Sequence, residues 1–117
     1  MNTTNAIRCA GEKAIENFTQ RAQSIPQEMC AAFHDEASNL EAHLLALYRV
    51  TVGLVREEED FDQIHHRWAS MVYLCDSSLV QLKELMAAHP VCGADIYYDK
   101  ILDMRNKCKR LENMHKA

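Results

Sequence analysis

The longest apolar pattern in the chain lies between residues 33 and 55. Apolar residues recur there in alternating steps of three and four positions, which is the spacing of one helix face: Phe33, Ala37, Leu40, Leu44, Leu47, Thr51 and Leu54. A second apolar row, formed by Leu45, Tyr48, Val52 and Val55, runs beside the first. A helix with two apolar rows needs cover from several neighbours, so the rest of the chain is predicted to pack around it.

Capping residues and acids divide the remainder of the chain. The segment 24–27, Ser-Ile-Pro-Gln, has the spacing of a capping box with proline in the first turn, and it predicts that the second helix begins there. Its end is less distinct, and one continuous helix reaching toward His89 is an alternative. Such a helix of about 60 residues would be unusually long. The acids around Asp60 suit a helix start, so we predict a reversal at residues 57–60.

The pattern therefore predicts four amphipathic helices joined by short connections. Their expected ranges are about 4–23, 24–57, 61–89 and 94–114. Together they predict an all-α fold, an up-down-up-down four-helix bundle with a long central second helix and a single domain over residues 1–117. The first helix has an alanine-rich seam, so it is expected to approach its neighbours closely and to be the most weakly held.

The second apolar row exceeds what a simple four-helix bundle requires. We therefore predict that Leu45, Tyr48, Val52 and Val55 bind a partner, first of all a second copy of the chain in a homodimer formed through the second and third helices. The adjacent tyrosines at 97 and 98 cannot both face the core. Tyr98 is therefore added as an exposed contact residue.

The five cysteines predict a compartment. Their number is odd and no C-x-x-C occurs, which favours reduced thiols, buried in the case of Cys75 and Cys108 on apolar seams. The N-terminal residues lack the features of a signal peptide, and the apolar runs fall short of the roughly 20 residues that span a bilayer. The expected location is the cytoplasm, with no membrane contact.

Two acid-x-x-His pairs raise the alternative of a ferritin-like metal site. In an up-down bundle the start of the third helix lies beside the end of the fourth, and the first and second helices can add carboxylates there. The ligand set of a di-iron bundle consists of such pairs with one carboxylate from each of two other helices. The candidates are Glu12, Glu58, Asp62, His65, Glu112 and His115. The simpler interpretation, in which these residues are solvated charged side chains at one end of the bundle, is favoured.

The segment from His65 to Ser70 resembles the motif of histidine-phosphotransfer domains, which are also four-helix bundles. In that motif the phosphorylated histidine is followed by a lysine and then small residues. His65, Ala69 and Ser70 match, whereas Trp68 stands in place of the lysine. The resemblance covers six residues and implies a degenerate phosphotransfer-like domain as a further alternative.

Charge and composition favour protein binding over chemistry. The net charge of −4 argues against nucleic acid, which needs a clustered positive field. No glycine-rich phosphate loop and no activated cysteine is evident. We therefore expect a non-catalytic adaptor, regulator or accessory protein that acts by protein–protein interaction and needs no cofactor.

Overall fold

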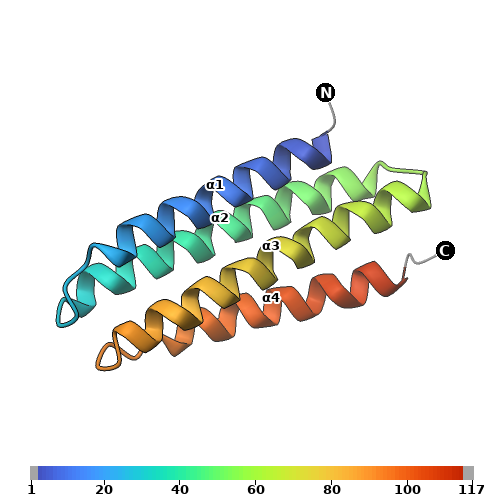
Figure 1. Ribbon diagram of the computed structural model, residues 1–117. Helices are drawn as coiled ribbons and strands as arrows, with labels where there is room; N and C mark the ends of the chain where they lie inside the picture. Colours follow the sequence, from blue (N-terminus) through green and yellow to red (C-terminus); the bar gives the residue numbers. More distant parts are fainter. Residues whose placement is uncertain (1–2, 115–117) are drawn as a thin grey trace.

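The chain folds into four helices over residues 3–114, the part that the computed structural model describes (Figure 1). The helices are α1 (Thr3–Gln23), α2 (Cys30–Arg56), α3 (Phe61–Ala88) and α4 (Asp95–Met114), with no strand among the described residues. Successive helices run in opposite directions, so α1 begins and α4 ends at the same end of a bundle 50 Å long. The predicted all-α four-helix bundle is confirmed. None of the four helices is both long and apolar enough to cross a membrane.

Helices α2 and α3 contact each other, and α1 and α4 each pack against both of them. Within residues 3–114, α1 and α4 do not meet, and the loosest of the helix–helix contacts is that between α2 and α4. Helix α3 is the most enclosed of the four, with eleven buried residues compared with five on α2. The long second helix is therefore not the best-covered one, although sequence analysis places it at the centre. The side of α2 next to α4 is covered least.

The apolar row that begins at Phe33 does face the core. Phe33, Ala37, Leu40, Leu44 and Thr51 are buried, while Leu47 and Leu54 are partly buried at its margin. The hydroxyl of Thr51 donates a hydrogen bond of 2.8 Å to the carbonyl oxygen of Leu47, so the one polar member of the row is satisfied within its own helix.

Helix α1 lies close against α3, as its small side chains predict. Gly11 is buried there, and a Cβ atom at this position would come within 2.5 Å of the Leu74 side chain. The seam also contains Ile15, whereas Ala10 is exposed. The alanine-rich seam predicted for this helix passes through Ala10 and Ala14, whereas the buried positions in its middle are Gly11 and Ile15, one residue further along.

The predicted start of α2 at the capping box is wrong. The hydroxyl of Ser24 donates to the carbonyl oxygen of Gln20, and the Ser24 backbone N–H to that of Arg21, so this serine terminates α1. Pro26 then lies in a turn, where its carbonyl oxygen accepts from the N–H of Met29. Helix α2 begins only at Cys30.

The predicted reversal between α2 and α3 is confirmed. Helix α2 ends at Arg56 and α3 begins at Phe61. The side chain of Asp60 accepts a hydrogen bond of 2.9 Å from the backbone N–H of Asp62, which caps α3 as predicted. The negative charge of this carboxylate is also stabilised by the positive N-terminal end of the helix dipole.

The expectation that the cysteines are reduced is wrong for two of the five. Cys30 and Cys92, 62 positions apart in the sequence, form a disulfide with their Cα atoms 4.9 Å apart. Cys9, Cys75 and Cys108 are free. Burial raises the pKa of Cys75 to about 12, with the charge of Cys108 as a smaller cause, and burial raises the pKa of Cys108 to about 11.

These pKa values predict how the free thiols react. The thiolate is the reactive form, so at neutral pH the two buried thiols stay protonated and shielded. We expect a disulfide reagent to modify only Cys9 rapidly in the native protein, and all three free cysteines after unfolding without reductant. Cys9→Ser should abolish the fast phase. Rapid reaction of three thiols in the native protein would contradict the packing described here.

Candidate functional site

The four apolar residues predicted to bind a partner lie on the side of α2 that adjoins α4. Leu45, Tyr48, Val52 and Val55 are all half-buried and pack against the core. The Tyr48 ring meets the buried Trp68 ring edge-on, with centroids 5.7 Å apart. Burial, and secondarily the charge of Cys108, raises the pKa of the Tyr48 hydroxyl. The row is thus anchored on one side to the core and open on the other.

A groove runs between α2 and α4 along this row, and we call it the α2–α4 groove. It consists of two adjoining hollows, both of which are lined by Leu45, Tyr48 and Lys107. The other lining residues are Glu41, Arg49, Val52, Gly53, Arg56, Lys100, Asp103 and Met104. Val55 does not line the groove. Three of the four predicted contact residues therefore share one apolar floor.

Charged side chains border the α2–α4 groove on both helices. Arg49 and Arg56 lie on α2, and Lys107 of α4 places its Nζ 5.7 Å from the centroid of the Tyr48 ring. Glu41 and Asp103 are the acids of the border. Lys100 of α4 is a further base of the border. Within residues 3–114 none of these six has an ion-pair partner among the salt bridges of the fold. Their charges are available to a molecule that enters the groove.

Gly53 has no role in the packing of the chain itself. A Cβ atom built at this position meets nothing within 4 Å, in contrast to Gly11, whose missing side chain lets Leu74 approach. Glycine within a helix costs about 1 kcal/mol relative to alanine. Nothing inside the described chain offsets this cost at Gly53, which lines the α2–α4 groove.

Gly53→Ala is accordingly expected to raise the free energy of unfolding by about 1 kcal/mol. Gly11→Ala brings the same gain in helix propensity but must displace the buried Leu74, so it should be less stable than Gly53→Ala by about 1–3 kcal/mol. Urea unfolding of the two variants beside the original chain measures both effects. Equal effects at the two glycines would contradict the difference in space around Gly11 and Gly53.

Tyr98 lies apart from the α2–α4 groove. It is half-buried rather than exposed, and it lines a shallow hollow between α3 and α4 with Leu79, Leu102 and Arg105. Tyr97 is half-buried as well, with its ring 5.5 Å from that of His34. Both tyrosines are half-buried, so the expectation that Tyr98 is exposed is wrong.

The candidate metal ligands are not gathered into one cluster. Glu12 is exposed and paired with Arg8, Glu58 pairs with Arg67 at 3.7 Å, and Asp62 is exposed. Only His65 and Glu112 meet, and His115 lies outside the described residues. Among residues 3–114 no group of three or more potential ligands comes together. The structure thus gives the ferritin-like alternative no support.

His65 is held by α4 rather than presented for phosphorylation. Its Nδ1 lies 3.1 Å from the backbone carbonyl oxygen of Glu112, and its Nε2 lies 3.8 Å from the carboxylate of the same residue. Ser70, one of the small residues of the resemblance to phosphotransfer domains, is buried. Both ring nitrogens thus face groups of α4, so the geometry does not favour this alternative.

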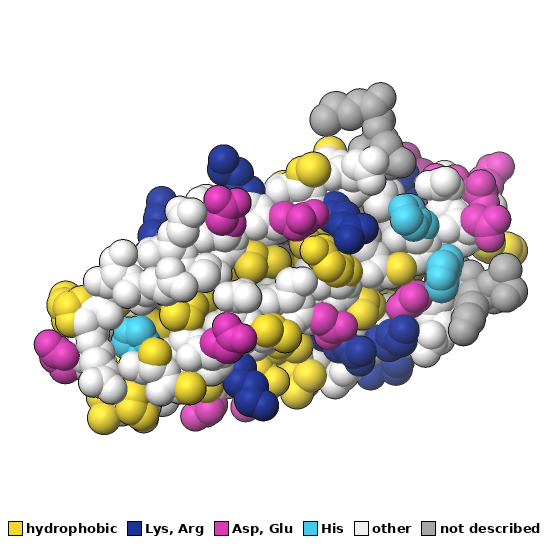
Figure 2. All heavy atoms as spheres, viewed as in Figure 1, with side chains coloured by type: hydrophobic (Ala, Val, Ile, Leu, Met, Phe, Trp, Pro, Cys, Tyr) yellow, Lys and Arg dark blue, Asp and Glu magenta, His cyan; other side chains and the backbone are white. Residues whose placement is uncertain are grey.

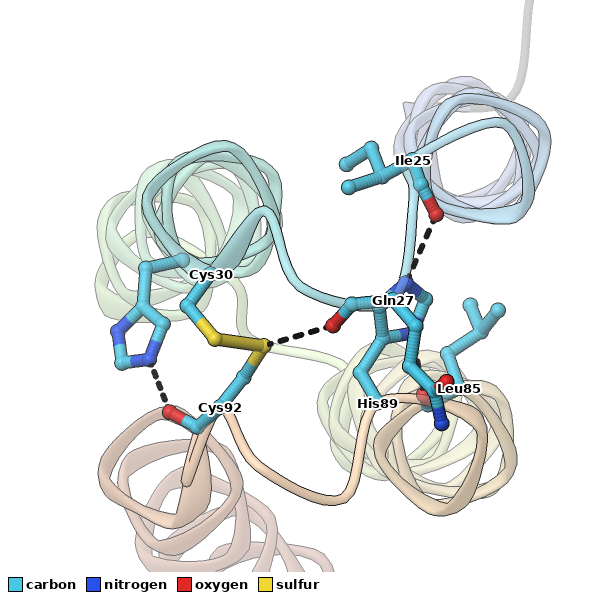
Figure 3. Close-up of a disulfide and its surroundings, with 7 residues drawn as sticks. Ile25, Gln27, Cys30, Leu85, His89 and Cys92 are labelled. Carbon is cyan, nitrogen blue, oxygen red and sulfur yellow. Dashed lines mark hydrogen bonds between the residues drawn. A yellow bond between two sulfur atoms is a disulfide. The ribbon is translucent and has the colours of Figure 1, made fainter.

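A second feature, not predicted from the sequence, is a fastened end of the bundle where the α1–α2 and α3–α4 loops meet. The Cys30–Cys92 disulfide joins the first residue of α2 to the α3–α4 loop (Figure 3). The Cys92 sulfur lies 3.6 Å from the carbonyl oxygen of Gln27, and the His34 Nε2 lies 2.6 Å from the carbonyl oxygen of Cys92. Three of these four residues come from the first loop or the start of α2.

His89 connects the same two loops through its ring. It is buried, with Nδ1 2.9 Å from the carbonyl oxygen of Leu85 and Nε2 3.0 Å from that of Ile25 (Figure 3). Phe33 stacks on the imidazole with centroids 4.4 Å apart. The end of α3 is thereby tied to the loop that precedes α2. These contacts are structural, since they join elements of the fold to one another.

The surface at the fastened end carries exposed apolar side chains. Met29, Val91 and Ile96 are more than half exposed there, near the exposed acids Glu28 and Asp95. Figure 2 shows hydrophobic side chains at this end, on the side where α3 turns into α4, with an acidic side chain at its tip, while charges of both signs are spread along the rest of the face in view. The loops hold these residues in place but supply no reactive group.

Comparison of the chain with protein-family models, curated proteins and solved structures finds no match. The geometry of the α2–α4 groove is therefore the basis of any functional conclusion.

Proposed function

We propose that this chain is a non-catalytic helical-bundle protein that binds another protein through the α2–α4 groove. The observation that carries the proposal is an apolar floor, half-buried and fixed to the core through Tyr48 and Trp68, bordered by charges without ion-pair partners in the described chain. Interfaces commonly combine an apolar centre with aromatic residues and a polar border.

The charges of the groove support a protein partner over nucleic acid. The basic side chains of Arg49, Arg56 and Lys107 stand beside the acids Glu41 and Asp103. A phosphate backbone would need a field of one sign, whereas a protein surface can offer charges of both signs. The net charge of −4 points in the same direction.

The Cys30–Cys92 disulfide supports an oxidising compartment rather than the cytoplasm that the cysteine count predicts. Cys92 is buried and the bond closes a long segment of chain, as in stabilising disulfides. Such bonds persist in oxidising compartments and are rare in the cytosol. Mass spectrometry of protein alkylated during cell lysis should find this pair oxidised; a pair alkylated as free thiols would place the chain in a reducing environment.

A photoreactive amino acid in place of Lys100 tests the proposed surface. Lys100 is exposed at the border of the groove, so the fold should be preserved and an adduct with a partner should form on irradiation in the source cell. The same amino acid in place of Val80, an exposed residue of α3 away from the groove, is the matched control.

Mass spectrometry then identifies the adducts. We expect one defined protein adduct from position 100, absent from position 80 and abolished by Val52→Arg in the groove floor. Equal adducts from both positions, or none from position 100, would overturn the proposal.

A further inference from the structure

We propose that the occupant of the α2–α4 groove is a second copy of this chain, packed antiparallel along α2 about a two-fold axis between Tyr48 and Arg49. This inference rests on the proposed function and names the partner. Several features of α2 become self-complementary under that one symmetry operation. The packing of a single chain leaves these residues only partly covered.

The first feature is the order of charges along the groove. In an isologous contact, residues the same number of positions from the axis face each other. Glu41 lies as many positions before the axis as Arg56 lies after it. At each end of the groove, Glu41 of one copy therefore faces Arg56 of the other. Both side chains line the groove, and neither is in an ion pair within the described chain.

The second feature is the apolar floor. Leu45 and Val52 are also equidistant from the axis, so Leu45 of one copy faces Val52 of the other on both sides of the centre. Tyr48 and Arg49 flank the axis itself. There the guanidinium of one copy lies near the tyrosine ring of the other, an arrangement favourable for a cation and an aromatic face.

The third feature is room for close approach. Ala46 and Gly53 are exposed on the same side of α2, and Gly53 leaves space that the chain does not fill. Helices pack at interaxial distances of 8–10 Å depending on the side chains at the contact, with small ones at the short end. Gly53 lies beside the residues that face the second copy, so its missing side chain leaves that flank of α2 open to a close approach.

A parallel arrangement of the two copies lacks this complementarity. It would place Arg56 against Arg56 and Glu41 against Glu41, and like charges across an interface are costly. A head-to-tail contact with the groove between α1 and α3, which is lined by Glu12 and Glu16, would match charge but would not close into a dimer. It would produce larger assemblies as concentration rises.

Charge exchange at the two ends of the groove tests the antiparallel dimer, with sedimentation velocity as the readout. The unaltered chain is expected to reach twice its mass of 13.4 kDa. Glu41→Arg places like charges at both ends, as does Arg56→Glu, and each should weaken dimerisation roughly tenfold or more. The double variant Glu41→Arg/Arg56→Glu should dimerise again.

Mixing the two single variants is the sharpest arm of the experiment. A heterodimer of Glu41→Arg with Arg56→Glu joins one acid and one base at each end, so the mixture should associate although each variant alone does not. Exchange at Glu84 and Lys83, exposed residues of α3 outside the groove, is the control and should leave the dimer unchanged. Circular dichroism should show the same helicity and melting for all variants.

Three results would overturn the inference: a monomer at every concentration, single variants that dimerise like the unaltered chain, or open-ended growth beyond the dimer. Failure of this inference is distinguishable from failure of the proposed function. A chain that stays monomeric but forms an adduct with a different protein from position 100 retains the groove as a binding surface and loses only the second copy as its occupant.

Discussion

Replacing both cysteines of the disulfide, Cys30→Ala/Cys92→Ala, is expected to lower the free energy of unfolding by about 4 kcal/mol. The bond joins residues 62 positions apart, and the entropy lost by the unfolded chain on closing a loop of that size gives this magnitude. For a domain of this length the melting temperature should fall by roughly 10–20 °C. The measurement is thermal unfolding followed by circular dichroism.

Cys9→Ala is the matched control, since Cys9 is exposed and free. It should melt with the unaltered chain. Adding a reductant to the unaltered protein should reproduce the double variant, because both remove the same restraint from the unfolded state. A double variant that melts at the original temperature would show that the two loops are held by His34 and His89 alone.

Phe33→Ala is expected to cost about 3–5 kcal/mol, the range for truncating a fully buried phenylalanine. Phe33 is completely buried, with its ring 6.5 Å from Phe18 of α1 and stacked on His89 at the end of α3. Its removal leaves a cavity where three elements meet and withdraws support from the imidazole. Urea denaturation gives the free energy directly.

Phe61→Ala provides the comparison with the same change in side chain. Phe61 is 69% exposed at the first residue of α3, so little apolar surface leaves water there on folding. Surface substitutions usually change stability by about 0.5 kcal/mol or less. A loss at Phe61 as large as that at Phe33 would contradict the assignment of the core.

The periodicity of the sequence predicts the helices well because the pattern is local. Phe33, Leu40 and Leu44 face the core since three- and four-residue steps place them on one face, whatever packs against it. Asp60 could likewise be assigned as a cap from its neighbours. Ser24 could not, because the same hydroxyl can end one helix or begin the next, and the carbonyl oxygen of Gln20 competes for it.

The disulfide depends on information that no local pattern contains. Cys30 and Cys92 become neighbours only because the first and third connections of an up-down-up-down bundle lie at the same end. The topology predicted from the sequence contains that signal, since each cysteine lies in or beside one of these connections. An odd cysteine count obscured it. His34 and His89 carry no such signal, as their partners are backbone carbonyl groups.

The candidate surface was predictable in part. The second apolar row identifies Leu45, Tyr48 and Val52 as residues that a single bundle does not fully cover. Which neighbour leaves them uncovered depends on how the helices diverge, so α4 and its Lys107 could not be assigned to the groove from the sequence. The role of Gly53 required the positions of all surrounding atoms.

Use of the α2–α4 groove as a binding surface is tested most directly by one comparison of adduct yields. A photoreactive residue in place of Lys100, exposed at the border of the groove on α4, is irradiated with and without the additional change Gly53→Trp. Tryptophan has open space in the single chain but would obstruct any surface that docks there. The account predicts that the adduct disappears while helicity and melting temperature are retained. An undiminished adduct in the presence of Gly53→Trp would contradict it.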